Sequence, residues 1–179
     1  IHVLCGYPTE NNLRHSHITR KENWNGISIR RYGLRAPAKK NFLYRSFSYL
    51  SFLTNVAIQL FISPREFKWL GVTNPPFNAQ VLALVSWIRR RDFHYFILDL
   101  HPEGLLAAGT LSHQNLLVKL WLSLNQRAYK RATTLFVLGR DMMQLLQNNY
   151  ELATGRMVYI PHWSAVELPA PIPLGNSRF

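Results

Sequence analysis

The chain has 179 residues, of which 47% are hydrophobic and 17% charged, and it carries a formal net charge of +12 at pH 7. This composition excludes a disordered chain and predicts one globular core, while the excess of lysine and arginine predicts a negatively charged partner such as a phosphate group, an anionic lipid surface or a nucleic acid. Cys5 is the only cysteine, which excludes a disulfide framework and a cysteine-ligated zinc site and favours a reducing, cytoplasmic setting.

Strand-like and helix-like segments alternate along the chain. A strand over 1–5 and a loop over 6–25 precede a strand over 27–32, which follows the turn signal Asn25-Gly26. The pattern then predicts a long apolar helix over 41–62, a strand over 68–73, a helix over 78–91 capped by Asn78, a strand over 95–100, a short helical piece near 105, a helix over 114–132, a strand over 133–138, a helix over 141–149 and a strand over 157–160. This alternation predicts an α/β fold with a Rossmann-like, mostly parallel sheet and helices on both faces.

The two ends of the chain indicate a piece trimmed from a longer protein. The sequence begins directly on a strand, and residues 167–174 form a proline-rich stretch that is typical of an extended linker. We therefore expect a Rossmann-like domain over 1–163 and the start of an interdomain linker over 164–179.

The segment from Phe93 to Gly104 is the most informative part of the sequence. An apolar run that is typical of a strand buried on both faces leads into Asp99, His101 and Glu103. Chemistry in an open α/β sheet gathers beyond the carboxyl ends of the strands, so a site is expected here. His101 either donates a proton or hydrogen bond to a substrate or is a structural histidine. Glu103 either contacts a ligand or suits the start of a helix electrostatically, and Asp99 is expected to be buried and paired with a backbone N–H or with Arg140.

Other predicted strand ends carry aromatic, imidazole or charged residues as well. They are Gly6-Tyr7-Pro8, Asn74–Phe77, Gly139–Asp141 and Pro161–Trp163. In a parallel sheet these loops meet along one rim and can wall a cleft; the alternative is that proline and glycine merely end the strands. The sequence has no glycine-rich phosphate loop, no nucleophile elbow and no compact set of metal ligands, so we expect no metal site and no cofactor.

Basic residues are concentrated around the start of the long helix. The cluster has no acid within it and consists of Arg30, Arg31, Arg35, Lys39, Lys40 and Arg45. The polar residues of the helix argue against a membrane span. Two interpretations stay open: a helix lying in a membrane interface, with Arg30, Arg31, Lys39 and Lys40 facing lipid phosphates, or an ordinary helix covering the sheet beside a solvated charge cluster.

Asp99-Leu100-His101-Pro102-Glu103 resembles the Asp-Leu-Trp-Pro-Glu motif of bacterial nucleotide-sugar glycosyltransferases that build cell-surface polysaccharides. Further stretches resemble other motifs of these enzymes in the same order: Leu4–Pro8, Asn25–Ile27, Thr73–Pro76, Thr134–Met142 and Val158–Trp163. The resemblance covers nearly the whole chain. It is to retaining GT-B glycosyltransferases of the family 4 (group 1) type, which consist of two Rossmann-like domains.

The resemblance implies that this chain is most of the amino-terminal, acceptor-binding domain, without the family's first strand and helix and without its donor domain. The implied activity is transfer of a sugar from a nucleotide-sugar donor to a lipid-linked or glycan acceptor in cell-envelope polysaccharide synthesis. The donor would be bound mainly by the absent domain, so the isolated piece is expected to be inactive. The other implied partner is an anionic membrane surface, at the inner face of the plasma membrane.

The matching positions supply the expected site residues. His101 and Glu103 are the catalytic candidates; the substrate-binding candidates are Asn74, Pro76, Asp99, Arg140 and His162. This interpretation predicts no nucleic-acid partner. Its main alternative is a basic, non-enzymatic α/β module that binds nucleic acid, because cations interleaved with aromatic rings also suit phosphates and bases. A third interpretation is a small domain with a purely structural, partner-docking role.

Overall fold

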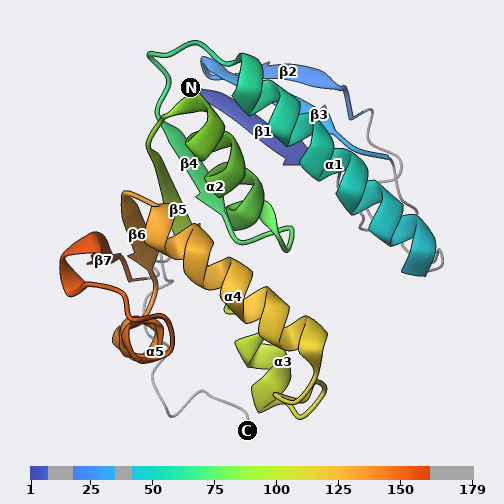
Figure 1. The fold of residues 1–179 in the computed structure, drawn as a ribbon. Coiled ribbons are helices and arrows are strands. Elements are labelled where there is room, and N and C mark those ends of the chain that lie inside the picture. The colour runs from blue at the N-terminus through green and yellow to red at the C-terminus, as the bar shows by residue number, and fades with distance from the viewer. Residues whose placement is uncertain (8–17, 35–41, 162–179) are drawn as a thin grey trace, which may run out of the picture.

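The computed structural model describes residues 1–7, 18–34 and 42–161. The described strands form two sheets rather than the single sheet expected, and a long helix connects them (Figure 1). The smaller sheet contains β1 (His2–Gly6), β2 (Lys21–Trp24) and β3 (Ile27–Tyr32) in the order β1-β3-β2. β3 pairs parallel with β1 and antiparallel with β2.

The strand β2 lies in a segment that the sequence predicts to be a loop. All four of its residues are exposed, so it lacks the apolar alternation that identifies a half-buried strand. Its pairing follows instead from the turn formed by Asn25 and Gly26, whose φ angles are 46° and 79°. This turn confirms the predicted turn signal and places β2 beside β3.

The larger sheet consists of four parallel strands. They are β4 (Trp69–Val72), β5 (Phe93–Ile97), β6 (Thr134–Val137) and β7 (Met157–Tyr159), paired in this order. The helices are α1 (Phe42–Ile62), which precedes β4, followed by α2 (Asn78–Arg89), α3 (Glu103–Ala107), α4 (Leu116–Arg131) and α5 (Arg140–Tyr150), with a 3₁₀ turn over Thr154–Arg156 before β7. The prediction of an α/β fold with a parallel sheet flanked by helices is confirmed.

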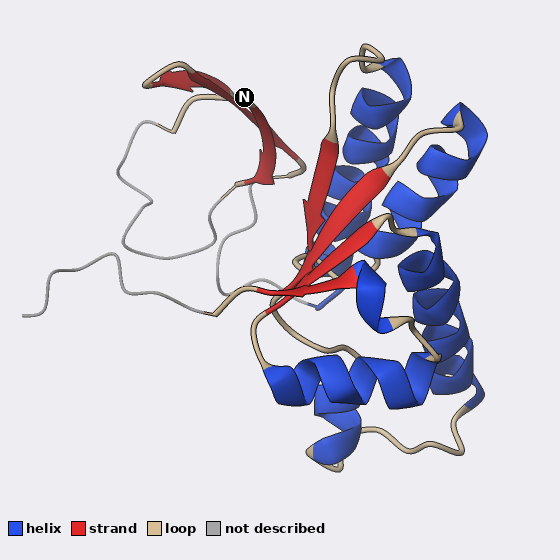
Figure 2. Cartoon of the chain, turned by 90° about the vertical axis from the view of Figure 1, so that its left-hand side faces the viewer, coloured by secondary structure: helices blue, strands red, loops and turns tan. Residues whose placement is uncertain are grey.

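The two faces of the larger sheet are covered unequally. Phe93, Tyr95 and Ile97 of β5 are buried, whereas His94 and Phe96 between them are only half-buried. Figure 2 shows the long helices packed on one side of this sheet. The expectation that β5 is buried equally on both faces is therefore corrected. Alternate residues of a strand point to opposite faces, so one face of β5 lies in the core, and on the other face the rings of His94 and Phe96 contact the ring of Phe136.

Asn78 does not cap α2 in the expected way. The residue before the helix is Phe77, which has a φ of 69° and caps it without a side-chain hydrogen bond. Asn78 is the first residue of the helix, and its Nδ2 donates to the Val72 carbonyl at 2.9 Å. This bond ties the start of α2 to the end of β4, so the asparagine fixes a strand-to-helix connection.

Gly71 is required by the close packing of α2 on β4. A Cβ at this position would lie 2.5 Å from Leu82 Cδ1 and 3.0 Å from Tyr95 Cδ2. We therefore expect Gly71→Ala to lower the free energy of unfolding by about 1–2 kcal/mol, because both neighbours are buried in a packed core. Urea unfolding measures this change. Gly6→Ala is the matched control, since a Cβ at Gly6 meets nothing within 4 Å; equal losses in the two variants would contradict the packing argument.

Candidate functional site

The carboxyl ends of β4 and β5 are joined by one threonine side chain. Because these strands are parallel, the segments that follow them lie at the same edge of the sheet. Thr73 Oγ1 donates to the Phe96 carbonyl at 3.2 Å and accepts from the Leu98 N–H at 2.7 Å and the Asp99 N–H at 3.4 Å. The loop after β5 is thereby held against the loop after β4.

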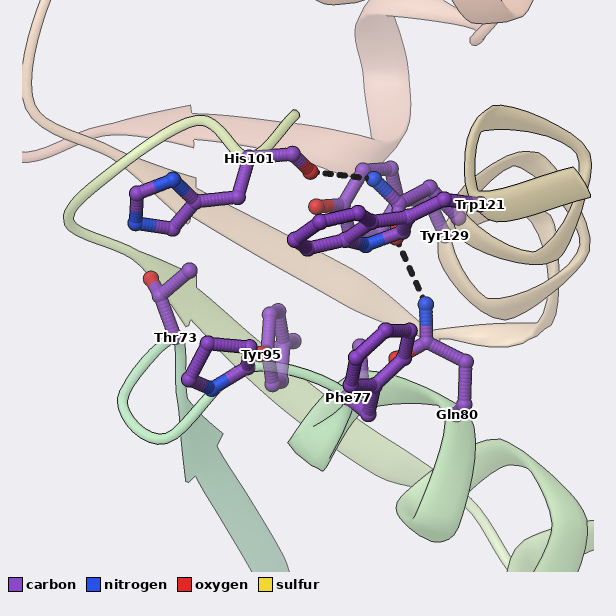
Figure 3. Close-up of a pocket in the computed structure, with 10 residues that line it drawn as sticks. Thr73, Phe77, Gln80, Tyr95, His101, Trp121 and Tyr129 are labelled. Atoms are coloured by element: carbon purple, nitrogen blue, oxygen red, sulfur yellow. Dashed lines mark hydrogen bonds between the residues drawn. The ribbon is translucent and has the colours of Figure 1, made fainter. Parts of the chain in front are cut away.

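A small pocket opens at this edge (Figure 3). Its lining residues come from the two strand ends and from α2 and α4: Thr73, Pro76, Phe77, Ala79, Gln80, Tyr95, His101, Trp121, Asn125 and Tyr129. The volume of about 10 Å³ is room for about one water molecule. The pocket by itself does not enclose a sugar, so it acts at most as one wall of a larger site.

Two aromatic rings form one side of the pocket. Phe77 stacks on Trp121 with ring centroids 4.8 Å apart and an interplanar angle of 26°. The His101 ring lies 6.5 Å from the Trp121 ring. Figure 3 shows the His101 imidazole directed to the side on which Thr73 lies, so the imidazole and the Thr73 hydroxyl occupy the same part of the pocket.

A buried amide holds the loop that carries His101. Asn125, on α4, donates from Nδ2 to the His101 carbonyl at 2.6 Å and to the Tyr150 hydroxyl at 3.3 Å. Its Oδ1 accepts from Gln80 Nε2 at 2.6 Å. Asn125 is 3% exposed, so water competes little for these hydrogen bonds. The network therefore fixes the backbone of the His101 loop relative to α2, α4 and α5.

Glu103 enters the same network through Tyr150. The Tyr150 hydroxyl donates to Glu103 Oε1. Burial raises the pKa of the Tyr150 hydroxyl above its ordinary value, and the hydrogen bond to Glu103 raises it further. Glu103 is also the first residue of α3, where a carboxylate is electrostatically favoured. Glu103 thus has the structural role at the start of a helix that the sequence predicts as one of two alternatives. Its hydrogen bond to Tyr150 uses only one of the two carboxylate oxygens.

Two buried polar atoms in the segment that follows β5 have no hydrogen-bond partner among the described residues. They are Nδ1 of His101 and Oε2 of Glu103. Buried polar atoms are normally satisfied, so these two are positioned to bind a water or a polar group of a ligand. An imidazole nitrogen can donate or accept a proton and a carboxylate oxygen can accept one, which are the capacities that acid–base catalysis requires.

The structure brings some of the predicted site residues together and separates others. Pro76 and His101 line the same pocket. Asn74 is exposed in the loop that contains Pro76, and Arg140 is exposed at the start of α5, with its guanidinium 5.6 Å from the centre of the Tyr159 ring. His162, Lys39 and Lys40 lie outside the described residues.

Asp99 and Arg31 differ from expectation. β5 ends at Ile97, so Asp99 lies beyond the strand and is exposed rather than buried. Its backbone N–H, and not its carboxylate, contacts Thr73. Arg31 is bound to Glu22 at 2.7 Å and to the Thr19 carbonyl at 3.0 Å, whereas Arg30 is exposed. The alternation of a strand separates these two neighbouring cations.

Sequence analysis missed the residues that organise the pocket: Gln80, Trp121, Asn125 and Tyr150. A signal for one of them was available. Asn125 falls at helical spacing with Val118, Ala128 and Tyr129, all of which are buried. A single amide on the apolar face of a predicted helix indicates a buried polar contact, but not its partner.

Within the described ranges no group of three or more histidine, cysteine, aspartate or glutamate residues is placed to hold a metal ion. Comparison with known proteins gives one finding and one negative result. No family model matches the chain. Over 110 residues, or 62% of this chain, the sequence is 26% identical to the probable glycosyltransferase WbjE of Pseudomonas aeruginosa, and the matched stretch spans 27% of the length of that relative.

Proposed function

We propose that this chain is the acceptor-side part of a glycosyltransferase that moves a sugar from a nucleotide-sugar donor to a lipid-linked or glycan acceptor in cell-envelope polysaccharide synthesis. The similarity to a probable glycosyltransferase supports the class of enzyme, and the Asp99–Glu103 motif supports a retaining GT-B enzyme of the family 4 type. Because the match spans about a quarter of the relative, the rest of the machinery, including the main donor site, is assigned to other parts of a longer enzyme.

The observation that carries this proposal is the convergence of Pro76, His101 and Glu103 at one edge of the parallel sheet. Pro76 and His101 line one pocket. The unpartnered atom of His101 lies in the loop that Asn125 holds, and that of Glu103 lies at the start of α3, which follows this loop. The small volume of the pocket fits a half-site, in which a second domain closes over the acceptor. In this arrangement His101 and Glu103 contact the reacting groups, Asn74 and Pro76 shape the acceptor side, and Asp99, Arg140 and His162 contact substrate at the rim.

We further propose that the enzyme works at the cytoplasmic face of a membrane. The support is α1, which buries Phe52, Val56 and Leu60 on one face and exposes Leu43 and Phe47 on another. No helix in the part of the chain described is long and apolar enough to span a bilayer. A helix with an exposed apolar face that follows a basic segment in the sequence suits attachment in the interface. In this proposal Arg30, Lys39 and Lys40 face the lipid. Arg31 is paired with Glu22 instead.

The sugar-transfer proposal is tested in the longer enzyme that contains this chain. Transfer of labelled sugar from a set of nucleotide-sugar donors to a lipid-linked acceptor fraction is measured for His101→Ala and Glu103→Gln. We expect each substitution to lower kcat at least roughly tenfold, because acid–base groups at a reacting centre contribute effects of this size or larger.

The matched controls are His113→Ala and Glu151→Gln, which remove an imidazole and a carboxylate that are both exposed and do not line the pocket. They are expected to keep the wild-type rate. Unchanged rates in His101→Ala and Glu103→Gln would remove the assignment of the site, and the absence of transfer from every donor by the wild-type enzyme would remove the assignment of function.

The nucleic-acid alternative gains no support from this pocket. Phe77 and Trp121 stack on each other, so one face of each ring is already occupied and fewer ring faces are left for stacking on a base. A salt-dependent mobility shift of RNA by the purified chain would reverse this preference.

A further inference from the structure

A second, strongly basic pocket lies at the opposite edge of the larger sheet. One wall is the connection from α1 to β4, which contributes Arg65, Phe67 and Lys68; the other runs from the end of α2 to the start of β5. These residues immediately precede strands, so they lie at the amino edge of the sheet, away from the candidate site. Figure 1 shows the α1–β4 connection at the upper end of the molecule and α3 at the lower end. The pocket has a volume of about 720 Å³, which is room for a small ligand.

The lining of this pocket has a large excess of positive charge. Five of its eight residues are cations and one is an acid: Arg65, Phe67, Lys68, Ile88, Arg89, Arg90, Arg91 and Asp92. The ion pairs found among the described residues, Arg31–Glu22 and Lys130–Glu151, involve none of them. The pocket therefore has an excess of cations; the acids near it are Asp92, in its lining, and Glu66, whose negative charge acts on Arg91.

Two of the five cations build the pocket. Arg91 donates to the carbonyls of Pro64 at 2.9 Å and Arg65 at 3.0 Å and to that of Phe67, and its guanidinium lies 4.3 Å from the centre of the Trp69 ring. Arg89 donates to the Ser63 carbonyl at 3.1 Å. These bonds hold the α1–β4 connection against the end of α2, so the pocket has a fixed wall.

The other three cations, Arg65, Lys68 and Arg90, are exposed, and their side chains have no hydrogen-bond or ion-pair partner among the described residues. Burial lowers the pKa of the Arg91 guanidinium, the positive charges of Arg89 and Arg65 lower it further, and the negative charge of Glu66 offsets part of this effect. The cations of this pocket therefore repel one another. A bound anion would relieve this repulsion, and its charge-assisted hydrogen bonds would be stronger than those to neutral groups.

Exposed apolar side chains flank the cations. Ile62 is 65% exposed, Trp87 69% and Ile88 51%; they lie at the ends of α1 and α2, next to the pocket in sequence. Cations beside an exposed tryptophan and isoleucines suit the boundary between lipid headgroups and acyl chains. A site for a soluble phosphate compound would need only the cations and not these apolar side chains.

We propose that this amino-edge pocket binds a phosphate group through Arg65, Lys68 and Arg90, on a site formed by the contacts of Arg89 and Arg91. The phosphate belongs either to a lipid headgroup or to a soluble phosphate compound. The site is separate from the carboxyl-edge pocket, so the proposal does not depend on the assignment of sugar transfer.

Two probes distinguish the sources. Inorganic pyrophosphate is titrated into the purified protein by calorimetry, and sedimentation is measured with vesicles of phosphatidylcholine alone or of equal parts phosphatidylcholine and phosphatidylglycerol. We expect binding of at least one phosphate probe that weakens as salt is raised, and no binding to phosphatidylcholine alone. The triple variant Arg65→Gln, Lys68→Gln, Arg90→Gln is expected to lose at least tenfold in affinity.

The matched control removes three exposed cations elsewhere: Lys21→Gln, Lys119→Gln, Arg127→Gln. It is expected to bind within about twofold of wild type, since its net charge falls by the same amount but the pocket is intact. Binding of pyrophosphate without binding to the vesicles identifies a soluble ligand. Binding to the vesicles that is also reduced by Trp87→Ser identifies a lipid headgroup.

Equal losses in the two triple variants would reduce the effect to net charge and overturn the proposal. So would wild-type binding by the pocket variant, or no binding of either phosphate probe by the wild type. Circular dichroism checks that the pocket variant folds, and the single variant Arg90→Gln, expected to lose at least threefold, replaces it if it does not.

Discussion

Replacing Asn125 by leucine is expected to lower the free energy of unfolding by about 3 kcal/mol. The substitution removes the partner of Gln80 Nε2 and of the His101 carbonyl, and one of the partners of the Tyr150 hydroxyl. Each buried polar group left unsatisfied costs about 1–3 kcal/mol, and the site is too buried for water to replace the amide freely. Leucine of similar size fills the space but offers neither donor nor acceptor. The midpoint and slope of urea unfolding measure the change.

Asn149→Leu is the matched control for this substitution. Asn149 is exposed on α5, and exposed substitutions change stability by about 0.5 kcal/mol or less. In the proposed enzyme, Asn125→Leu should also reduce sugar transfer, since the His101 loop loses the bond that holds it to α4. A variant as stable as wild type would show that the network does not stabilise the fold, and the account of the loop would then be wrong.

The second large effect is a steep loss of stability at alkaline pH. Burial raises the pKa values of Tyr95 and Tyr129, and for Tyr129 the neighbouring titrating groups Tyr95, Tyr150 and Glu103 raise it further. Tyr150 is raised as well. In the unfolded chain a tyrosine loses its proton near pH 10. Above that pH the folded protein retains protons that the unfolded chain has lost, so the free energy of unfolding falls as pH rises. The stabilisation is fully present below the unfolded pKa.

Each such tyrosine contributes a slope of about −1.4 kcal/mol per pH unit above about pH 10. Urea unfolding at a series of pH values between about 8 and 11 measures this slope. Tyr129→Phe is expected to make the slope shallower by the contribution of one tyrosine.

Phe93→Leu serves as the comparison, because it disturbs a buried aromatic residue of β5 without removing a hydroxyl. It should lower stability equally at every pH and leave the slope unchanged. A slope in Tyr129→Phe identical to that of wild type would mean that this hydroxyl does not resist ionisation in the folded state.

The candidate site was partly visible in the sequence. The polar residues after β5 were identified because an apolar run ended abruptly at Asp99, His101 and Glu103, and the parallel sheet was predicted from the alternation of strands and helices. The prediction that Asp99 is buried within the strand was wrong, since hydropathy does not show at which residue a strand stops pairing with its neighbours. The partner of Glu103 could not be predicted either, because Tyr150 lies 47 positions away and reads as an ordinary end of an amphipathic helix.

The sequence by itself determined the class of fold, the order of nearly all the elements and the loop in which His101 lies, because these depend on local hydrophobic periodicity and turn residues. Only the tertiary structure decided that the strands form two sheets, that Asn125 joins Gln80, His101 and Tyr150, and that Arg65 and Arg90 face one pocket. Such juxtapositions depend on how the helices pack on the sheet, and that packing brings together residues whose separation along the chain carries no periodic signal.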